Sequence, residues 1–169
     1  MKIIIGGDLY IDPKKREKIN FDKKLLKLFE NSDFNILNLE SPISNFSLEP
    51  IQKIGPNLLC SPSIFKQISS LGITTFCLAN NHILDYGKEG LISTLKECVK
   101  HNITTTGAEI AGDFKPMVLE KNGLSVGLIN ICENEWSSYE DYGHGASGLN
   151  KERLTLQLLN LKGRFNKII

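Results

Sequence analysis

Length, composition and charge exclude several classes of protein. The chain has 169 residues, of which 41% are hydrophobic, and this suits one domain with a real core better than two domains. Twenty basic and nineteen acidic side chains leave a formal charge of +1, so no global field argues for nucleic acid or an anionic membrane. Without a signal-peptide pattern or an apolar run of roughly 18 residues that could span a membrane, the sequence predicts a cytoplasmic protein.

Three apolar runs end in polar side chains. Residues 2–7 lead into Asp8, residues 34–39 lead into Glu40, and residues 73–78 lead into the block Asn80-Asn81-His82. Each run predicts a buried strand. Ligands of open α/β sheets bind at the carboxyl ends of the strands, so parallel strands would bring these side chains to one edge.

The residue types at these strand ends point to a metal site. Two carboxylates, a carboxamide oxygen and an imidazole suit Mg²⁺, Mn²⁺, Zn²⁺ or Fe, and His82 could instead act as a proton donor. Asp8 alone would equally suit a turn cap, and the asparagines a turn motif. Glu40 is harder to explain in that way, because a carboxylate directly after an apolar strand is costly to bury without a partner. Asp85 supports the site by capping the next helix or by accepting a hydrogen bond from His82.

The segments between the strands predict helices. Helical spacing of apolar residues covers residues 21–31, a helix starts at Ser61-Pro62 and closes at Gly72, and another runs from about residue 88 to residue 101. A fourth strand is expected at residues 103–106. This alternation predicts a parallel sheet with right-handed crossovers. The proline-containing stretch 41–57 reads as a long loop, which is either a wall of a substrate site or a surface excursion.

The last third of the chain has a different pattern. Residues 117–120 and 124–131 flank Lys121-Asn122-Gly123, and an Asn-Gly pair between apolar runs predicts an antiparallel hairpin. A glycine-rich loop at residues 139–148, a helix after Asn150 and the opening of a strand at residues 167–169 follow. Glu133 and Glu135 come after the second hairpin strand, within plausible reach of the site.

The cysteine spacing and the absence of known catalytic and phosphate-binding motifs exclude further types of site. Cys60, Cys77, Cys98 and Cys132 lie in separate stretches without CxxC spacing, which predicts reduced, packed thiols. The sequence contains no GxxxxGK[ST] phosphate loop and no GxSxG nucleophile motif.

The motif blocks together resemble a known family. The sequences Asn38-Leu39-Glu40-Ser41-Pro42, Leu78-Ala79-Asn80-Asn81-His82 with Asp85-Tyr86-Gly87, and Gly107-Ala108 resemble the poly-γ-glutamate capsule synthesis proteins of the CapA/PgsA type. That family is similar to the calcineurin-like metallophosphoesterases. The resemblance implies a layered αββα sandwich, with a mixed sheet of parallel βαβ units followed by an antiparallel hairpin, and a dinuclear metal centre.

The resemblance also implies roles for individual residues. Asp8 corresponds to a ligand of the first metal, Glu40 to the bridging carboxylate, Asn81 to a ligand of the second metal and His82 to the acid beside the leaving group. Asp85 would assist His82. We take Asn80, Glu133 and Glu135 as candidate substrate-binding residues. A divalent ion (Mn, Mg, Zn or Fe) and a phosphorylated or polyanionic substrate follow as expectations.

One departure from the family pattern changes the expected activity. Two further histidine-bearing blocks of the family have no counterpart here, so residues 1–169 are expected to be the N-terminal portion of a longer domain, with weak metal binding and little hydrolysis. An exposed sheet edge would then favour self-association. Two alternatives stay open: a non-catalytic component of a capsule synthesis or export assembly that binds polymer or a partner, and an α/β domain that binds a small molecule.

Overall fold

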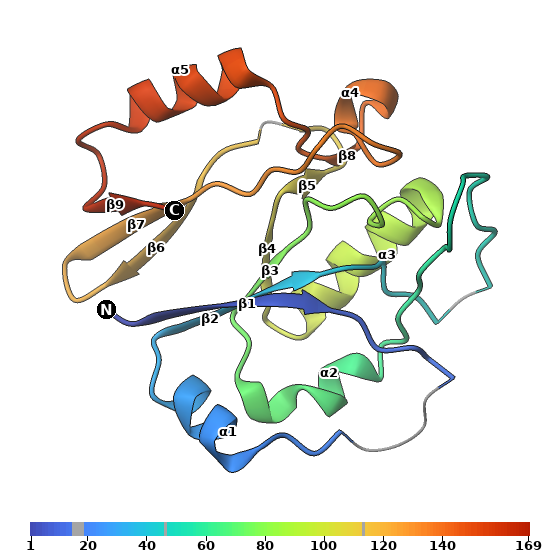
Figure 1. Ribbon diagram of the computed structural model, residues 1–169, viewed down its shortest axis with the longest axis horizontal. Helices are drawn as coiled ribbons and strands as arrows, with labels where there is room; N and C mark the ends of the chain where they lie inside the picture. The colour runs from blue at the N-terminus through green and yellow to red at the C-terminus, as the bar shows by residue number, and fades with distance from the viewer. Residues whose placement is uncertain (15–18, 46, 113) are drawn as a thin grey trace.

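The computed structural model describes residues 1–14, 19–45, 47–112 and 114–169, and its largest element is a parallel sheet. The strands of this sheet lie in the order β1 (Ile3–Leu9), β2 (Phe34–Leu39), β3 (Thr75–Cys77) and β4 (Thr104–Thr106). All neighbouring pairs are parallel. The connections contain α1 (Lys23–Glu30), α2 (Ile64–Gln67), the 3₁₀ helix η1 (Ser69–Leu71) and α3 (Gly87–Lys100), as Figure 1 shows. The predicted parallel sheet with helical connections is confirmed.

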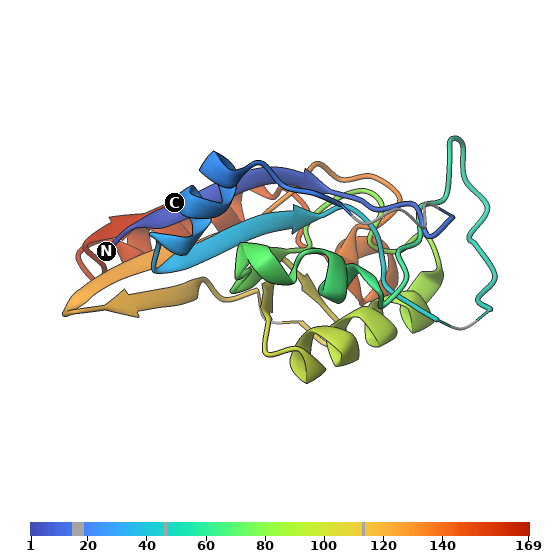
Figure 2. The ribbon, with the colours of Figure 1, turned by 90° about the horizontal axis from the view of Figure 1, so that it is seen from below.

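Helices cover one face of this sheet. The odd-numbered side chains Leu37 and Leu39 of β2 pack into a core with residues of α1, α2 and α3, including Phe29, Phe65 and Leu91. Figure 2 shows α2 and α3 together on one side of β2. Asn35 points to the same side, where its amide donates to the carbonyl oxygens of Phe29 (3.1 Å), Leu71 (3.0 Å) and Gly72 (3.1 Å) and joins α1 to η1.

A second sheet packs on the opposite face. The hairpin β6 (Met117–Lys121) and β7 (Leu124–Leu128) is antiparallel, and β9 (Lys167–Ile168) joins β7 in parallel. The buried core between the two sheets contains Ile36 from β2 and, from the hairpin, Leu119, Val126 and Leu128. The fold is therefore a mixed α/β sandwich of the metallophosphoesterase-like type, as expected.

Short elements complete the chain. A two-stranded antiparallel sheet joins β5 (Ala108–Glu109) to β8 (Gly145–Ala146), and α4 (Tyr139–Tyr142) precedes β8. The N-cap of helix α5 (Lys151–Leu161) is Asn150, whose side chain accepts a hydrogen bond from the Arg153 amide. In Figure 1, α5 lies on the side of the molecule away from α1 and α2. No helix in the described ranges is long and apolar enough to cross a bilayer.

Several predicted boundaries were wrong. The second hairpin strand ends at Leu128 rather than at residue 131, because the following residues turn toward the end of β3, where the Asn130 side chain binds a backbone amide. The helix expected from Ser61 is split into α2 and η1, and the Ser61 hydroxyl only accepts from the Ser63 amide at 3.2 Å. The predicted glycine-rich loop contains α4 and β8, which have too few residues to show a period.

A bulge in β1 determines the side on which Asp8 lies. Ile5 pairs with Ile36 and Asp8 pairs with Asn38, so the register advances three residues along β1 but two along β2. Side chains alternate along a strand, and an extra residue reverses the face of all that follow. Asp8 therefore shares the face of Ile5, Ile36 and Asn38, which is the face toward the second sheet.

Candidate functional site

The carboxylates of Asp8 and Glu40 both accept hydrogen bonds from the side-chain amide of Asn38, near the end of β2. The Asn38 side chain donates to Asp8 Oδ1 at 2.8 Å and also to Glu40 Oε2. The side-chain oxygen of Asn38 accepts from Asn80 Nδ2 at 3.2 Å. Asn38 thus links the ends of three strands, and the first two predicted strand ends come together as expected.

Asn80 extends the network to the central motif. Its amide also donates to the Leu39 carbonyl oxygen at 2.8 Å, and its side-chain oxygen accepts from the His82 backbone amide at 3.0 Å. Because Asn80 is only 7% exposed, its side chain acts as an internal brace for the turn that carries Asn81 and His82. This bonding explains its position without a substrate contact.

Electrostatics in this network centre on Glu40. Burial, together with the negative charge of Asp8, raises the pKa of the Glu40 carboxyl, although the hydrogen bond from Asn38 acts in the opposite direction. Two carboxylates around one amide attract a cation, because a positive charge would relieve their repulsion. The side chains of Asp8, Glu40, Asn81 and His82 are all at least partly accessible to solvent.

The oxygen-rich donor set suits a divalent ion, but it is small. Asp8 and Glu40 supply hard carboxylate oxygens, and the carboxamide of Asn81 lies in the adjoining turn. Across the described parts of the chain, no three His, Cys, Asp or Glu side chains cluster as metal-binding groups do. A cation here would depend on two carboxylates supplemented by amide oxygens and water.

His82 and Asp85 form a separate branch of the site. His82 Nδ1 lies 2.7 Å from Asp85 Oδ2, and Asp85 is fully buried. Tyr86, not Asp85, occupies the N-cap position of α3. Of the two roles open for Asp85 in the sequence, the structure therefore selects the hydrogen bond to His82.

Sequence reasoning missed residues that hold this region together. Lys53, in the loop after β2, pairs with Asp85 and approaches His82. Asn130 Oδ1 accepts from the Ala79 amide at 2.8 Å, and Ser137 Oγ donates to the Asn80 carbonyl oxygen at 2.6 Å. Asn38 carried a readable signal, because it is a polar residue within an apolar strand. The other three gave no signal in the sequence.

Glu133 and Glu135 stay outside the network. Both side chains are exposed, and neither makes a hydrogen bond or an ion pair within the described residues. The intervening segment is nevertheless close to the site, since the charges of Glu135 and Glu40 both act on the Cys132 thiol. A role in substrate binding remains a prediction for the two glutamates.

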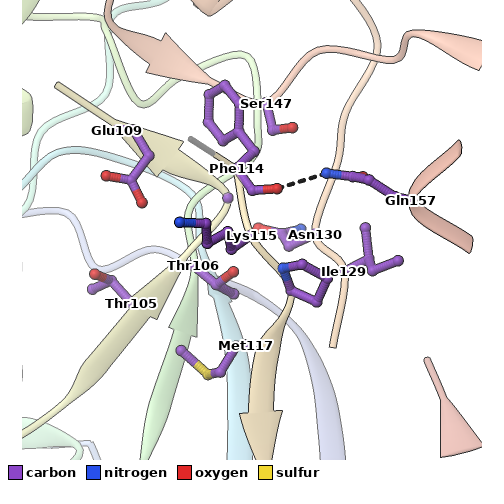
Figure 3. Close-up of a pocket in the computed structure, with 12 residues that line it drawn as sticks. Thr105, Thr106, Glu109, Phe114, Lys115, Met117, Ile129, Asn130, Ser147 and Gln157 are labelled. Atoms are coloured by element: carbon purple, nitrogen blue, oxygen red, sulfur yellow. Dashed lines mark hydrogen bonds between the residues drawn. The ribbon is translucent and has the colours of Figure 1, made fainter. Parts of the chain in front are cut away.

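A cavity of about 170 Å³ lies next to this site, where β4 ends. Thr105 and Thr106 line it from β4, and Asn130 and Ser147 line it from later segments (Figure 3). Gln157 of α5 closes one side and donates to the Phe114 carbonyl oxygen at 2.7 Å. Asn130 contacts both this cavity and the backbone before Asn80, so the two features are adjacent.

Fold and site together define a class of protein. The structure is an α/β sandwich of the metallophosphoesterase-like type, with a polar network at the carboxyl edge of its parallel sheet. Residues 2–162 match the family described as bacterial capsule synthesis protein PGA_cap, and the chain belongs to that family. This confirms the resemblance seen in the motifs.

Two characterised relatives are similar over part of the chain. The capsule biosynthesis protein CapA of Bacillus anthracis is 31% identical over 108 residues, which are 62% of this chain and 26% of that protein. The PGA biosynthesis protein CapA of Bacillus subtilis (strain 168) is 26% identical over 109 residues, which are 63% of this chain and 29% of that protein. The matched region thus spans less than a third of either relative.

Proposed function

We propose that this chain is a metallophosphoesterase-like component of capsule polymer synthesis. The observation that carries the proposal is the continuous hydrogen-bonded path from Asp8 and Glu40, through Asn38 and Asn80, to His82. The capsule role is supported by family membership and by the names of the two relatives. The polymer made, and any polyanionic or phosphorylated substrate, are part of the proposal.

The residues divide the chemistry between them. Asp8, Glu40 and Asn81 would hold a divalent ion, which when bound would supply Lewis-acid activation of a phosphoryl group and of the attacking water. His82 would give a proton to the leaving oxygen, and Asp85 would hold its ring in place. Asn38 would keep the two carboxylates at a fixed separation. With so few ligands we expect weak metal binding and slow hydrolysis of phosphodiesters.

Manganese binding and phosphodiester cleavage test the two halves of this proposal separately. Mn²⁺ is titrated by electron paramagnetic resonance, and hydrolysis of bis-p-nitrophenyl phosphate is followed in parallel. The double variant Asp8→Asn with Glu40→Gln should weaken Mn²⁺ binding at least about tenfold. His82→Ala should retain the metal and lower the hydrolysis rate by about a hundredfold. Glu49→Gln, in an exposed loop position, is the matched control.

The same measurements distinguish the catalytic role from a non-catalytic binding role. A non-catalytic role in binding polymer or a partner is favoured by the small donor set of the described residues. Mn²⁺ binding that is unchanged in the double variant would overturn the metal site. Metal binding without any His82-dependent hydrolysis would reject the catalytic role and support the binding role.

A further inference from the structure

The loop between β2 and α2 places a buried lysine against the histidine of the site. This loop, residues 41–59 with residue 46 undescribed, extends along one end of the molecule in Figures 1 and 2. The Lys53 side chain is 2% exposed; its Nζ pairs with Asp85 Oδ1 and lies 3.1 Å from His82 Nδ1. A lysine is buried to this extent only when its charge is paired, so the ion pair with Asp85 holds Lys53 in this position.

The same loop holds both oxygens of the Asp85 carboxylate. Oδ1 accepts from Lys53, while Oδ2 accepts from the Leu58 backbone amide at 2.6 Å. The Ile51 amide donates to the backbone carbonyl of Asp85 at 2.9 Å. The loop therefore determines the orientation of the Asp85 carboxylate, and with it the direction in which Oδ2 faces the His82 ring.

The hydrogen-bond partners of His82 favour the tautomer with the proton on Nδ1. An ionised carboxylate can only accept, so the 2.7 Å contact between Asp85 Oδ2 and Nδ1 requires a proton on Nδ1. If Lys53 donated to Nδ1 instead, two lone pairs would face each other across that distance. The Lys53 protons consequently go to Asp85. In the neutral ring Nε2 is then the nitrogen without a proton, so His82 must take up a second proton there before it can give one to the leaving oxygen.

We propose that Lys53 is a positioning residue of the site, which holds the Asp85 carboxylate so that His82 is fixed as the Nδ1–H tautomer. The inference rests on the proposed function for its catalytic consequence, but the placement of the ring can be measured without metal or substrate. Asp85 alone does not give this result, because without Lys53 its Oδ1 would lose the partner that the described residues give it, and the carboxylate could rotate away from His82.

The test uses nitrogen NMR of the His82 imidazole in the full chain. In the wild-type protein, at a pH raised until the ring is neutral, Nδ1 should show the shift of a protonated ring nitrogen and Nε2 that of an unprotonated one. In Lys53→Met this single pattern should give way to signals of both tautomers. Lys53→Arg should restore the pattern at least in part, and Lys66→Met, an exposed lysine of α2, should leave it unchanged.

A second variant protects the test against misfolding. Lys53→Met leaves Asp85 buried without its counter-charge, so Lys53→Met with Asp85→Asn removes both charges and keeps the shape. That double variant should fold, and it is compared with Asp85→Asn alone, because replacing Asp85 removes the charged acceptor of the Nδ1 proton. A difference in the His82 ring pattern between these two variants is then due to Lys53. If phosphodiester hydrolysis is present, Lys53→Met should lower kcat by about ten- to a hundredfold with little change in KM.

Each outcome is decisive. A wild-type ring whose neutral form is protonated on Nε2 alone, or a single Nδ1–H pattern that survives in Lys53→Met, would overturn the positioning role. Identical ring patterns in the double variant and in Asp85→Asn alone would overturn it as well. If the pattern depends on Lys53 but Mn²⁺ binding and hydrolysis are absent, the positioning role stands and only the proposed function fails.

Discussion

At the residue scale, Glu40 is placed where its charge is unfavourable. It follows the buried strand β2 and shares the Asn38 amide with Asp8, and burial and the Asp8 charge raise the pKa of its carboxyl. The native state therefore binds the Glu40 proton more tightly than the unfolded chain does. Stability from this source is complete below the ordinary pKa and is lost as pH rises through the higher native pKa.

Glu40→Gln should therefore stabilise the protein selectively at neutral pH. The glutamine oxygen can still accept from Asn38, but it carries no charge to repel Asp8. Urea unfolding should give nearly equal stabilities for the variant and the wild type at about pH 4, and a more stable variant at about pH 7.5. Glu49→Gln is the control. A variant that is less stable at the higher pH would contradict the raised pKa.

The four cysteines give a second residue-scale prediction. All are free thiols, as expected from their spacing. Burial raises the pKa of Cys77 to about 11 and that of Cys98 to about 12, while burial and nearby acidic side chains raise that of Cys132 to about 11. Burial also raises the pKa of Cys60.

Native thiols should accordingly react slowly. At about pH 8 a thiol of pKa near 11 is only about one thousandth thiolate, and the thiolate is the reactive form. Reaction with Ellman's reagent should be at least about a hundredfold slower in the native protein than in guanidinium, where all four thiols should react. Fast labelling of the native protein would show that a cysteine is more accessible than the structure indicates.

At the element scale, the turn after β4 depends on a glycine. Gly107 has φ +90, and a Cβ there would run into the Asn130 side chain and come within 2.8 Å of the Ala79 amide nitrogen. Those are the two groups whose hydrogen bond joins the later segment to the central motif. Glycine permits both the backbone conformation and the close approach of the chains.

Gly107→Ala should therefore lower the free energy of unfolding by more than the left-handed backbone conformation alone would explain. We expect a loss of about 2–5 kcal/mol, from the left-handed conformation together with displaced packing. Gly123→Ala in the hairpin turn is the matched control, because Gly123 has φ +75 but open space around its Cα. Its loss should be about 1–2 kcal/mol in urea unfolding. Equal losses for the two variants would show that the contact with Asn130 and Ala79 is unimportant.

At the scale of the whole molecule, stability depends on the contact between the two sheets. Neighbouring residues of β6 separate its two faces, since Leu119 is 3% exposed in the inter-sheet core and Val118 is 46% exposed. Leu119→Ala should lower the free energy of unfolding by about 2–5 kcal/mol. Val118→Ala should change it by less than about 1 kcal/mol. A small effect of Leu119→Ala would mean that the hairpin is not firmly packed on the parallel sheet.

Local patterns in the chain were sufficient for much of this architecture. Apolar runs, the Asn122-Gly123 turn and the polar ends of β1, β2 and β3 each depend on neighbours within a few residues, so they can be read without coordinates. The meeting of Asp8, Glu40 and the Asn80 turn also followed, because parallel strands end at one edge. Self-association through a sheet edge and the catalytic roles remain predictions.

Packing decided which distant groups meet at the site. Lys53 and His82 are 29 residues apart, Asn130 and Ala79 are 51 apart, and Ser137 and Asn80 are 57 apart. No hydrophobic period specifies such pairs, because a hydrogen-bond partner is selected by the segments that the core brings together. The bulge that turns Asp8 toward Asn38 belongs to the same category, since a register shift is defined only by the neighbouring strand.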